Sequence, residues 1–290
     1  MLLDYVSDMI IGIVLAIIGA FINNFGVVLQ KRQVNIKAPP EMKDKTMMDI
    51  GKFLKDPLWD LGILMQTVLY LPFLLLSFDF LGITLAQPIS ACGLIFLILG
   101  LFLMLNERFK HKSEYFGLGI LVFGVISIAL GGVAGDITID IFIANLANFW
   151  ILFAIMVALS GLSVVMIIKN KARFPFFGVL LGNIYSMVSI SMQWFQLGID
   201  EFSHAFGLLI LILGIGGAIA GTVLGIVTGQ EAYKRGQAIW TIPFMQITIN
   251  ILPVLAGLFI FAQYIINLAF FWIGLGCIIV GGSMLARFEV

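Results

Sequence analysis

The sequence predicts an all-α polytopic membrane protein, and three observations favour this class. Of the 290 residues, 61% are hydrophobic and 11% are charged, whereas a soluble domain has about 45–50% apolar and about 25% charged residues. Apolar runs of about 20 residues, enough to cross a bilayer as a helix, recur along the whole chain. All Lys and Arg residues fall between alternate pairs of runs. Lipid is therefore the expected solvent, and backbone groups that lack water as a partner must be satisfied within helices.

We predict nine membrane spans and no separate soluble domain. Because Asp4 and Asp8 precede the first run without any cation, that run is expected to be a retained span and not a secretory signal. The cell membrane is the default location for such a chain. The predicted spans cover residues 9–29, 58–77, 82–105, 115–134, 145–168, 174–197, 205–228, 237–261 and 265–286.

The distribution of charge supports this number of spans and orients them. All sixteen Lys and Arg residues lie after spans one, three, five, seven and nine. The opposite segments carry only acids, which are Asp4, Asp8, Asp79, Asp136, Asp140, Asp200 and Glu201. Loop cations face the cytoplasm, so we expect the N-terminus outside and the C-terminus inside. Eight or ten spans would break the alternation.

The one long cytoplasmic loop, residues 31–56, shows a possible interfacial helix. Thr46 and Asp49 have the spacing of a capping box, and Met47, Ile50 and Phe53 can share one apolar face. The helix would end before Pro57. A solvated loop fits the same residues equally well.

Two halves of the chain resemble each other. In each, a glycine precedes a proline by six or seven residues (Gly82 and Pro88; Gly236 and Pro243), and an apolar helix, a polar corner and a glycine-rich span follow. The two copies cross the membrane in opposite directions in the nine-span topology. We therefore expect two inverted repeats, residues 1–136 with four helices and residues 137–290 with five, and such repeats are typical of transporters.

These features resemble the drug/metabolite transporter superfamily (EamA-like proteins), which is built from two inverted five-helix repeats. The proline-containing fourth helix of its repeat ends near Glu-Arg, and Pro88 with Glu107–Arg108 matches that pattern in the first half. Pro243 matches it in the second half, where Ala262–Gln263 stands in place of Glu-Arg. The resemblance implies alternating-access transport of a small solute.

Further features resemble the NIPA-like magnesium transporter branch of that superfamily. Nine spans with one helix missing from the first half is its arrangement. The segment NNFGVVLQKR at 23–32 and the pair Trp59 and Gly62 are also similar to it. The resemblance implies Mg²⁺ as the substrate.

Polar side chains within the predicted spans are the candidate substrate-binding residues, because polar groups in lipid usually face the bundle interior or a water-filled path. Four of them on span six (183, 186, 189 and 193) follow spacings of 3, 3 and 4, which predicts one shared face. Amides that only bond helices to one another would give the same pattern. The predicted substrate-binding residues are Asn23, Asn24, Gln66, Tyr70, Gln87, Asn183, Ser186, Gln193, Gln246 and Asn250.

Two prolines and two glycines are predicted to break helices or take part in gating. Pro88 and Pro243 lack an N–H, so each leaves a backbone carbonyl one turn earlier without its helical partner. That carbonyl could line a substrate path, or a neighbouring side chain could fill a simple kink. Gly221 and Gly225 belong to a stripe with four-residue spacing that lets another helix approach closely. Packing within the fold, rocking during transport and dimerisation all fit that stripe.

The chemistry of the spans leaves two substrates open. Mg²⁺ prefers oxygen ligands and keeps several waters, but the carboxylates nearest to the spans, Asp79, Glu107 and Glu231, lie at their ends, so no metal ligands are assigned. An amide-rich site near Trp194 and Trp240 suits a small organic metabolite or a lipid-linked head group as well. A zero net charge gives no reason to expect nucleic acid.

The remaining function classes are weaker. An enzyme would need a nucleophile–base pair or a metal site, and the sequence has no HExxH, no GxSxG and no His or Asp in the middle of a span. We therefore expect no enzyme activity and no cofactor. The expected partners are membrane lipid and a small-molecule or ion substrate, in a monomer or homodimer, and a non-transporting membrane scaffold is the other alternative.

Overall fold

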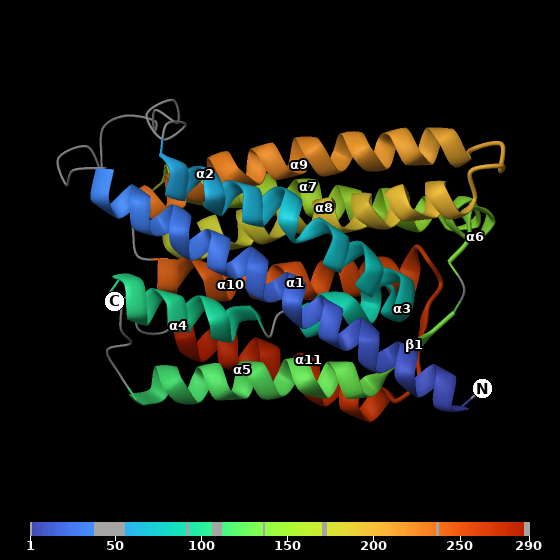
Figure 1. The fold of residues 1–290 in the computed structure, drawn as a ribbon, viewed down its shortest axis with the longest axis horizontal. Helices are drawn as coiled ribbons and strands as arrows, with labels where there is room; N and C mark the ends of the chain where they lie inside the picture. The colour runs from blue at the N-terminus through green and yellow to red at the C-terminus, as the bar shows by residue number, and fades with distance from the viewer. Residues whose placement is uncertain are drawn as a thin grey trace.

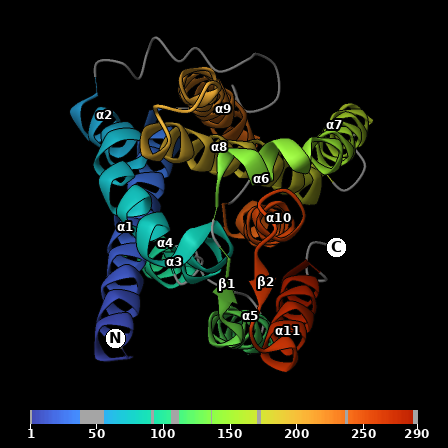
Figure 2. The ribbon, with the colours of Figure 1, turned by 90° about the vertical axis from the view of Figure 1, so that its right-hand side faces the viewer.

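A computed structural model describes residues 2–37, 56–90, 93–105, 112–135, 137–169, 173–235 and 238–286, and these are almost entirely helical (Figure 1). The first half contains α1 (Leu2–Lys37), α2 (Pro57–Leu64), the π-helical stretch η3 (Met65–Leu69), α3 (Leu71–Ser90), α4 (Gly93–Leu105) and α5 (Lys112–Gly131). The second half contains α6 (Ile139–Ala144), α7 (Leu146–Ile168), α8 (Arg173–Asp200), α9 (Gly207–Arg235), α10 (Ala238–Phe259) and α11 (Leu268–Ala286). The strands β1 (Val133–Ala134) and β2 (Tyr264–Ile265) pair antiparallel and join the two halves (Figure 2).

The helices confirm the predicted class of an all-α membrane protein. Five segments are long and apolar enough to cross a bilayer, and four shorter helices are also apolar. Their outer surfaces carry large exposed apolar side chains such as Trp150, Ile151 and Leu213, which lipid would cover. The long segments are Met9–Ile36, Pro57–Ala86, Leu146–Ile168, Phe174–Asp200 and Gly207–Ala232, and the shorter ones are Ile95–Leu105, Tyr115–Ile128, Ile247–Phe259 and Leu268–Gly281.

The first helix is longer than predicted. It continues from Leu2 to Lys37, beyond the expected end at residue 29 and into the segment assigned to the loop. Residues 30–38 contain neither glycine nor proline, so nothing stops the helix at its predicted end. The extension buries Lys31, although the sequence assigned this residue to a cytoplasmic loop. The possible helix with Thr46 and Asp49 lies outside the described residues.

The second predicted span begins where expected but is not one regular helix. Asp56 caps α2, because its side chain accepts hydrogen bonds from the N–H groups of Leu58 at 2.9 Å and Trp59 at 3.1 Å. The π-helical turns of η3 follow, and then α3. Such single π turns often occur at functional sites.

A break in the backbone lies at the start of the third predicted span. Gly82, at its expected start, has φ of 65° and ψ of 166°, so it breaks α3 into two helical pieces. Only glycine adopts this backbone conformation without strain. The structure describes α3 up to Ser90 and α4 from Gly93.

Glycine-mediated helix pairs hold the bundle together. A Cβ atom built on Gly62 of α2 would lie 2.7 Å from the carbonyl oxygen of Gly26 on α1. One built on Gly274 of α11 would lie 2.5 Å from the carbonyl oxygen of Gly124 on α5. Contacts this close bring helix backbones together, as small residues do in membranes. The α5–α11 pair lies along one side of the bundle, and α7, α8 and α9 lie on the other (Figure 1).

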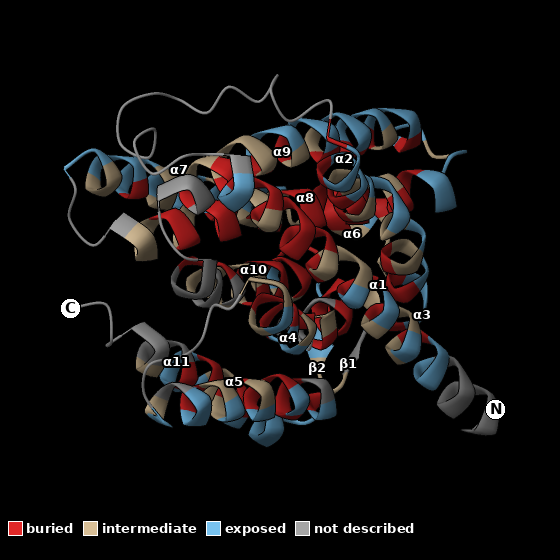
Figure 3. Ribbon diagram, turned by 60° about the vertical axis from the view of Figure 1, so that its left-hand side comes forward, coloured by how far each residue is buried: buried red, intermediate tan, exposed pale blue. Residues whose placement is uncertain are grey.

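The core lies between these layers. In Figure 3 the buried residues gather on α8 and the sides of α1 and α10 that face it, whereas α7 and α9 carry exposed residues outward. One end of the core is closed by aromatic rings, with ring centroids of Phe142 and Trp194 at 5.6 Å and of Phe149 and Trp194 at 5.1 Å. The short helix α6 thus packs over the end of α8.

Candidate functional site

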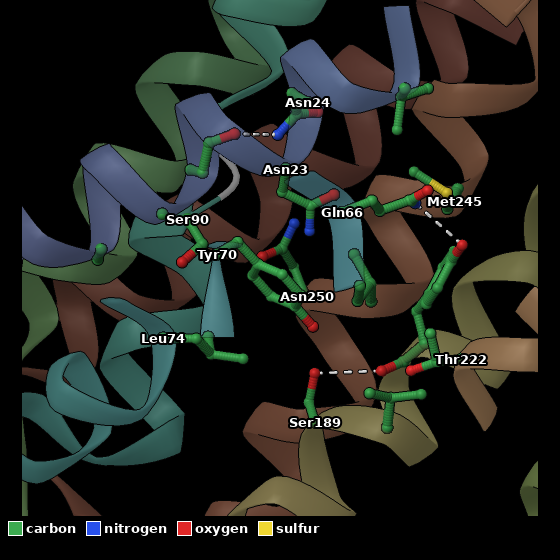
Figure 4. Close-up of a pocket in the computed structure, with 17 residues that line it drawn as sticks. Asn23, Asn24, Gln66, Tyr70, Leu74, Ser90, Ser189, Thr222, Met245 and Asn250 are labelled. Atoms are coloured by element: carbon green, nitrogen blue, oxygen red, sulfur yellow. Dashed lines mark hydrogen bonds between the residues drawn. The ribbon is translucent and has the colours of Figure 1, made fainter. Parts of the chain in front are cut away.

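A cavity of about 80 Å³ lies at the centre of the bundle, where α1, η3, α8, α9 and α10 meet (Figure 4). A buried site needs roughly 10–15 Å³ of such volume for each water, so there is room for about five waters or a small solute. Nine of its seventeen described lining residues have polar side chains. The polar lining residues are Asn23, Asn24, Gln66, Tyr70, Ser90, Tyr185, Ser189, Thr222 and Asn250.

Five of the predicted substrate-binding residues line this one cavity. They are Asn23 and Asn24 from α1, Gln66 from η3, Tyr70 from the residue that follows it, and Asn250 from α10. Figure 4 shows Asn23, Tyr70 and Asn250 close together around the same space. Gln66 and Tyr70 are four residues apart and therefore point to the same side. The structure thus brings together amides from both halves of the chain.

The Asn24 amide is directed partly back to its own helix. Its Nδ2 donates a hydrogen bond to the carbonyl oxygen of Ala20 at 2.7 Å, one turn earlier (Figure 4). The neighbouring Asn23 has no such bond among those described, and it is only partly buried. Of the pair, Asn23 is therefore better placed to contact a solute.

A chain of buried hydrogen bonds runs away from one end of the cavity. Gln66 Nε2 donates to the Tyr185 hydroxyl at 3.0 Å, and Gln30 Nε2 donates to Gln66 Oε1 at 2.7 Å. Gln230 Nε2 then donates to Gln30 Oε1 at 2.6 Å. We call these four residues the glutamine chain. It connects α8, η3, α1 and α9, and so fixes the helices at this end of the cavity.

Sequence reasoning missed Gln30 and Gln230. The available signal was spacing, because Gln30 follows Asn23 by seven residues, which is two helical turns on the same face. The predicted first span ended at residue 29, so Gln30 was placed just beyond it. Its burial, with 1% of its surface exposed, follows from the unpredicted extension of α1.

The predicted polar face of span six is divided between different neighbours. Asn183 Nδ2 donates to the Met156 carbonyl oxygen at 2.5 Å and to the Ser160 hydroxyl at 2.6 Å, both on α7. The Ser186 hydroxyl has two acceptors within hydrogen-bond distance, the carbonyl oxygens of Gly182 on its own helix at 2.7 Å and of Thr248 on α10 at 3.2 Å. Of the four residues on this face, only Ser189 lines the cavity.

All four residues are buried on α8, but they spread over an arc that faces different neighbours. Each step of three residues falls about 60° short of a full turn at 3.6 residues per turn, so Asn183 and Ser189 lie about 120° apart. Gln193 is buried but does not line the cavity either. Asn183, Ser186 and Gln193 lie outside the cavity, and the first two serve helix packing.

The helix-break residues are only partly described. Pro88 and Gln87 lie in the second piece of α3, and Pro243 and Gln246 lie in α10, but their side chains are outside the described part. Gly221 and Gly225 let α9 pack closely on α8. A Cβ atom at Gly221 would lie 2.6 Å from a methyl group of Val188, and one at Gly225 would lie 2.7 Å from the Tyr185 ring. Val188 and Tyr185 both line the cavity, so this glycine stripe supports its wall.

None of the described residues that line the cavity is charged. The described acids lie elsewhere: Asp79 Oδ1 accepts a hydrogen bond from Gln196, and Glu201 Oε2 accepts one from the N–H of Ile139 at 3.1 Å. In the described part of the chain, no three or more His, Cys, Asp or Glu residues gather as metal ligands would. A cation in the cavity would therefore meet amide, hydroxyl and carbonyl oxygens.

Comparisons of the chain with family models, curated proteins and solved structures gave no match.

Proposed function

We propose that this protein is a membrane transporter that moves a small polar solute through the central cavity by alternating access. One observation carries the proposal: amides and hydroxyls from α1, η3, α8 and α10 surround a single space inside an apolar helical bundle. Helix packing alone requires polar groups to pair with each other, not to surround a space large enough for several waters. The described residues of the cavity wall are uncharged, and such a wall suits transport better than catalysis.

The proposed architecture is the nine-span, inverted-repeat topology with the N-terminus outside, in the cell membrane. Helix pairing supports it, because α1 packs on α2–α3 in the first half as α8 packs on α9 in the second. The final helices of the two halves, α5 and α11, then pack on each other. The resemblance to the drug/metabolite transporters remains part of this proposal.

Two substrates remain candidates for the cavity. The resemblance to the NIPA-like branch favours Mg²⁺, which would enter with several of its waters because it dehydrates reluctantly. The lining favours a small uncharged organic solute, since the amides donate as well as accept hydrogen bonds and none of the described lining residues is a carboxylate that would offset a charge. Both substrates would use the same cavity.

Flux into proteoliposomes tests the proposal. The purified protein is assayed for uptake of Mg²⁺, of amino acids, of sugars and polyols, and of quaternary amines. Saturable uptake of one substrate is expected, and Asn250→Ala should raise its KM by about tenfold, the equivalent of one lost hydrogen bond of ~1.4 kcal/mol. The matched control is Asn183→Ala, which removes a buried amide that contacts α7 and not the cavity.

The outcomes separate the parts of the proposal. Uptake of an organic solute without Mg²⁺ uptake would contradict the magnesium assignment and leave transport standing. Saturable uptake that Asn250→Ala leaves unchanged would show that the cavity is not the site. If none of the solutes is moved, the transport proposal is wrong.

A further inference from the structure

A second, apolar cavity adjoins the polar one. It has a volume of about 200 Å³ and lies between α10 and the α5–α11 pair. Eleven of its twelve described lining residues are apolar, and the twelfth is Asn250, which also lines the polar cavity. The two cavities therefore share one residue, on α10.

The apolar cavity reaches the outer surface of the bundle. Phe259 and Trp272, which line it, are 58% and 61% exposed, whereas Asn250 is 2% exposed. Phe259 lies nine positions after Asn250 on α10, which is about 13.5 Å along the helix. The cavity thus extends from a surface that lipid covers to the buried wall of the polar cavity.

A long, narrow, apolar space in contact with lipid fits an acyl chain. Water gains no hydrogen bonds from such a wall, and an empty cavity loses the dispersion contacts of its lining. At the inner end, however, a plain hydrocarbon would meet an amide. A molecule with an apolar chain and a small polar end matches both spaces at once.

We propose that the two cavities together bind a single-chain amphiphile, with its chain in the apolar cavity and a small uncharged hydroxyl-bearing head among the amides. The head-group half of this inference rests on the function proposed above. The uncharged lining of the polar cavity selects against charged heads, which would lose their hydration without an ion partner. The opening beside Phe259 and Trp272 provides entry from the bilayer.

Fluorescence quenching measures this binding directly. The full-length protein in lipid nanodiscs is titrated with a monoacylglycerol that carries bromine on its chain, and the quenching of Trp272 is followed. Saturable quenching is expected, and Trp272→Phe should remove that component because it removes the reporter. The comparison probe is a brominated hydrocarbon of the same chain length without the glycerol head.

Matched variants assign the two halves of the site. Val254 lines only the apolar cavity, so Val254→Phe should fill it and raise the Kd of the monoacylglycerol at least tenfold. Val280→Phe, on an exposed position of α11 that lines neither cavity, is the control. Gln66→Leu should weaken binding of the monoacylglycerol and leave the hydrocarbon unchanged. If Val254→Phe impairs folding, Leu255→Phe fills the same cavity from the next position.

Equal saturable quenching by the hydrocarbon and the monoacylglycerol would overturn the inference, because the cavity would then hold only a chain from the bilayer. So would an unchanged Kd in both filling variants. Uptake of a water-soluble solute without amphiphile binding would refute this inference and leave the transport proposal intact. Amphiphile binding without uptake of any solute would support this inference and refute the transport proposal.

Discussion

The glutamine chain offers the sharpest test of how the helices are fixed at one end of the cavity. Gln30 is its central residue, since it donates to Gln66 at 2.7 Å and accepts from Gln230 at 2.6 Å. The substitution Gln30→Leu removes both bonds and keeps a side chain of similar volume. We therefore expect little change in packing, and a decrease in the free energy of unfolding that comes from the lost hydrogen bonds.

The magnitude follows from the number of bonds. Side-chain hydrogen bonds between membrane helices contribute ~0.6 kcal/mol on average and ~1.7 kcal/mol at most, so two give about 1.2–3.4 kcal/mol. The loss falls toward the upper part of this range because the amides of Gln66 and Gln230 remain buried. We expect Gln30→Leu to lower the free energy of unfolding by about 3 kcal/mol.

The assay is reversible unfolding in mixed micelles, with helix content followed as SDS is increased. A double-mutant cycle with Gln66→Leu isolates the bond between the two side chains, and its coupling energy should be about 0.6–1.7 kcal/mol. The control is Thr67→Val, because the Thr67 hydroxyl bonds only to the Ile63 carbonyl oxygen of its own helix among the described contacts. Strict additivity of Gln30→Leu and Gln66→Leu, within ~0.3 kcal/mol, would refute the bond.

Three further predictions concern packing, capping and topology. Gly274→Ala should destabilise the protein by about 1–3 kcal/mol because its methyl group would meet the backbone of α5; Gly276→Ala, with open space around it, should be neutral or stabilising in the same unfolding assay. Asp56→Ala should lower the free energy of unfolding by about 1 kcal/mol, because α2 loses its N-terminal cap. An unchanged unfolding midpoint would contradict the stabilising role of the cap. With the native cysteines replaced, Ser203→Cys should react with a membrane-impermeant thiol reagent from outside intact cells and Lys169→Cys only after permeabilisation; labelling of both from the same side would contradict the proposed orientation.

The candidate site was predictable in part. Asn23, Gln66, Tyr70 and Asn250 were identified because polar side chains in an apolar run must face something other than lipid. Asn183 satisfied the same rule, but its amide contacts the α7 backbone and not the cavity. Sequence spacing gives the direction of a side chain around its own helix, whereas the identity of the facing neighbour depends on how the helices pack.

The sequence by itself determined that the chain is an all-helical membrane protein and where its apolar helices lie, because burial in lipid requires long apolar runs with internally satisfied backbones. Only the tertiary structure decided the extension of α1 that buries Gln30 and the meeting of two cavities at Asn250. These features depend on contacts between helices that are distant in sequence. The local pattern of polar and apolar residues carries no information about such contacts.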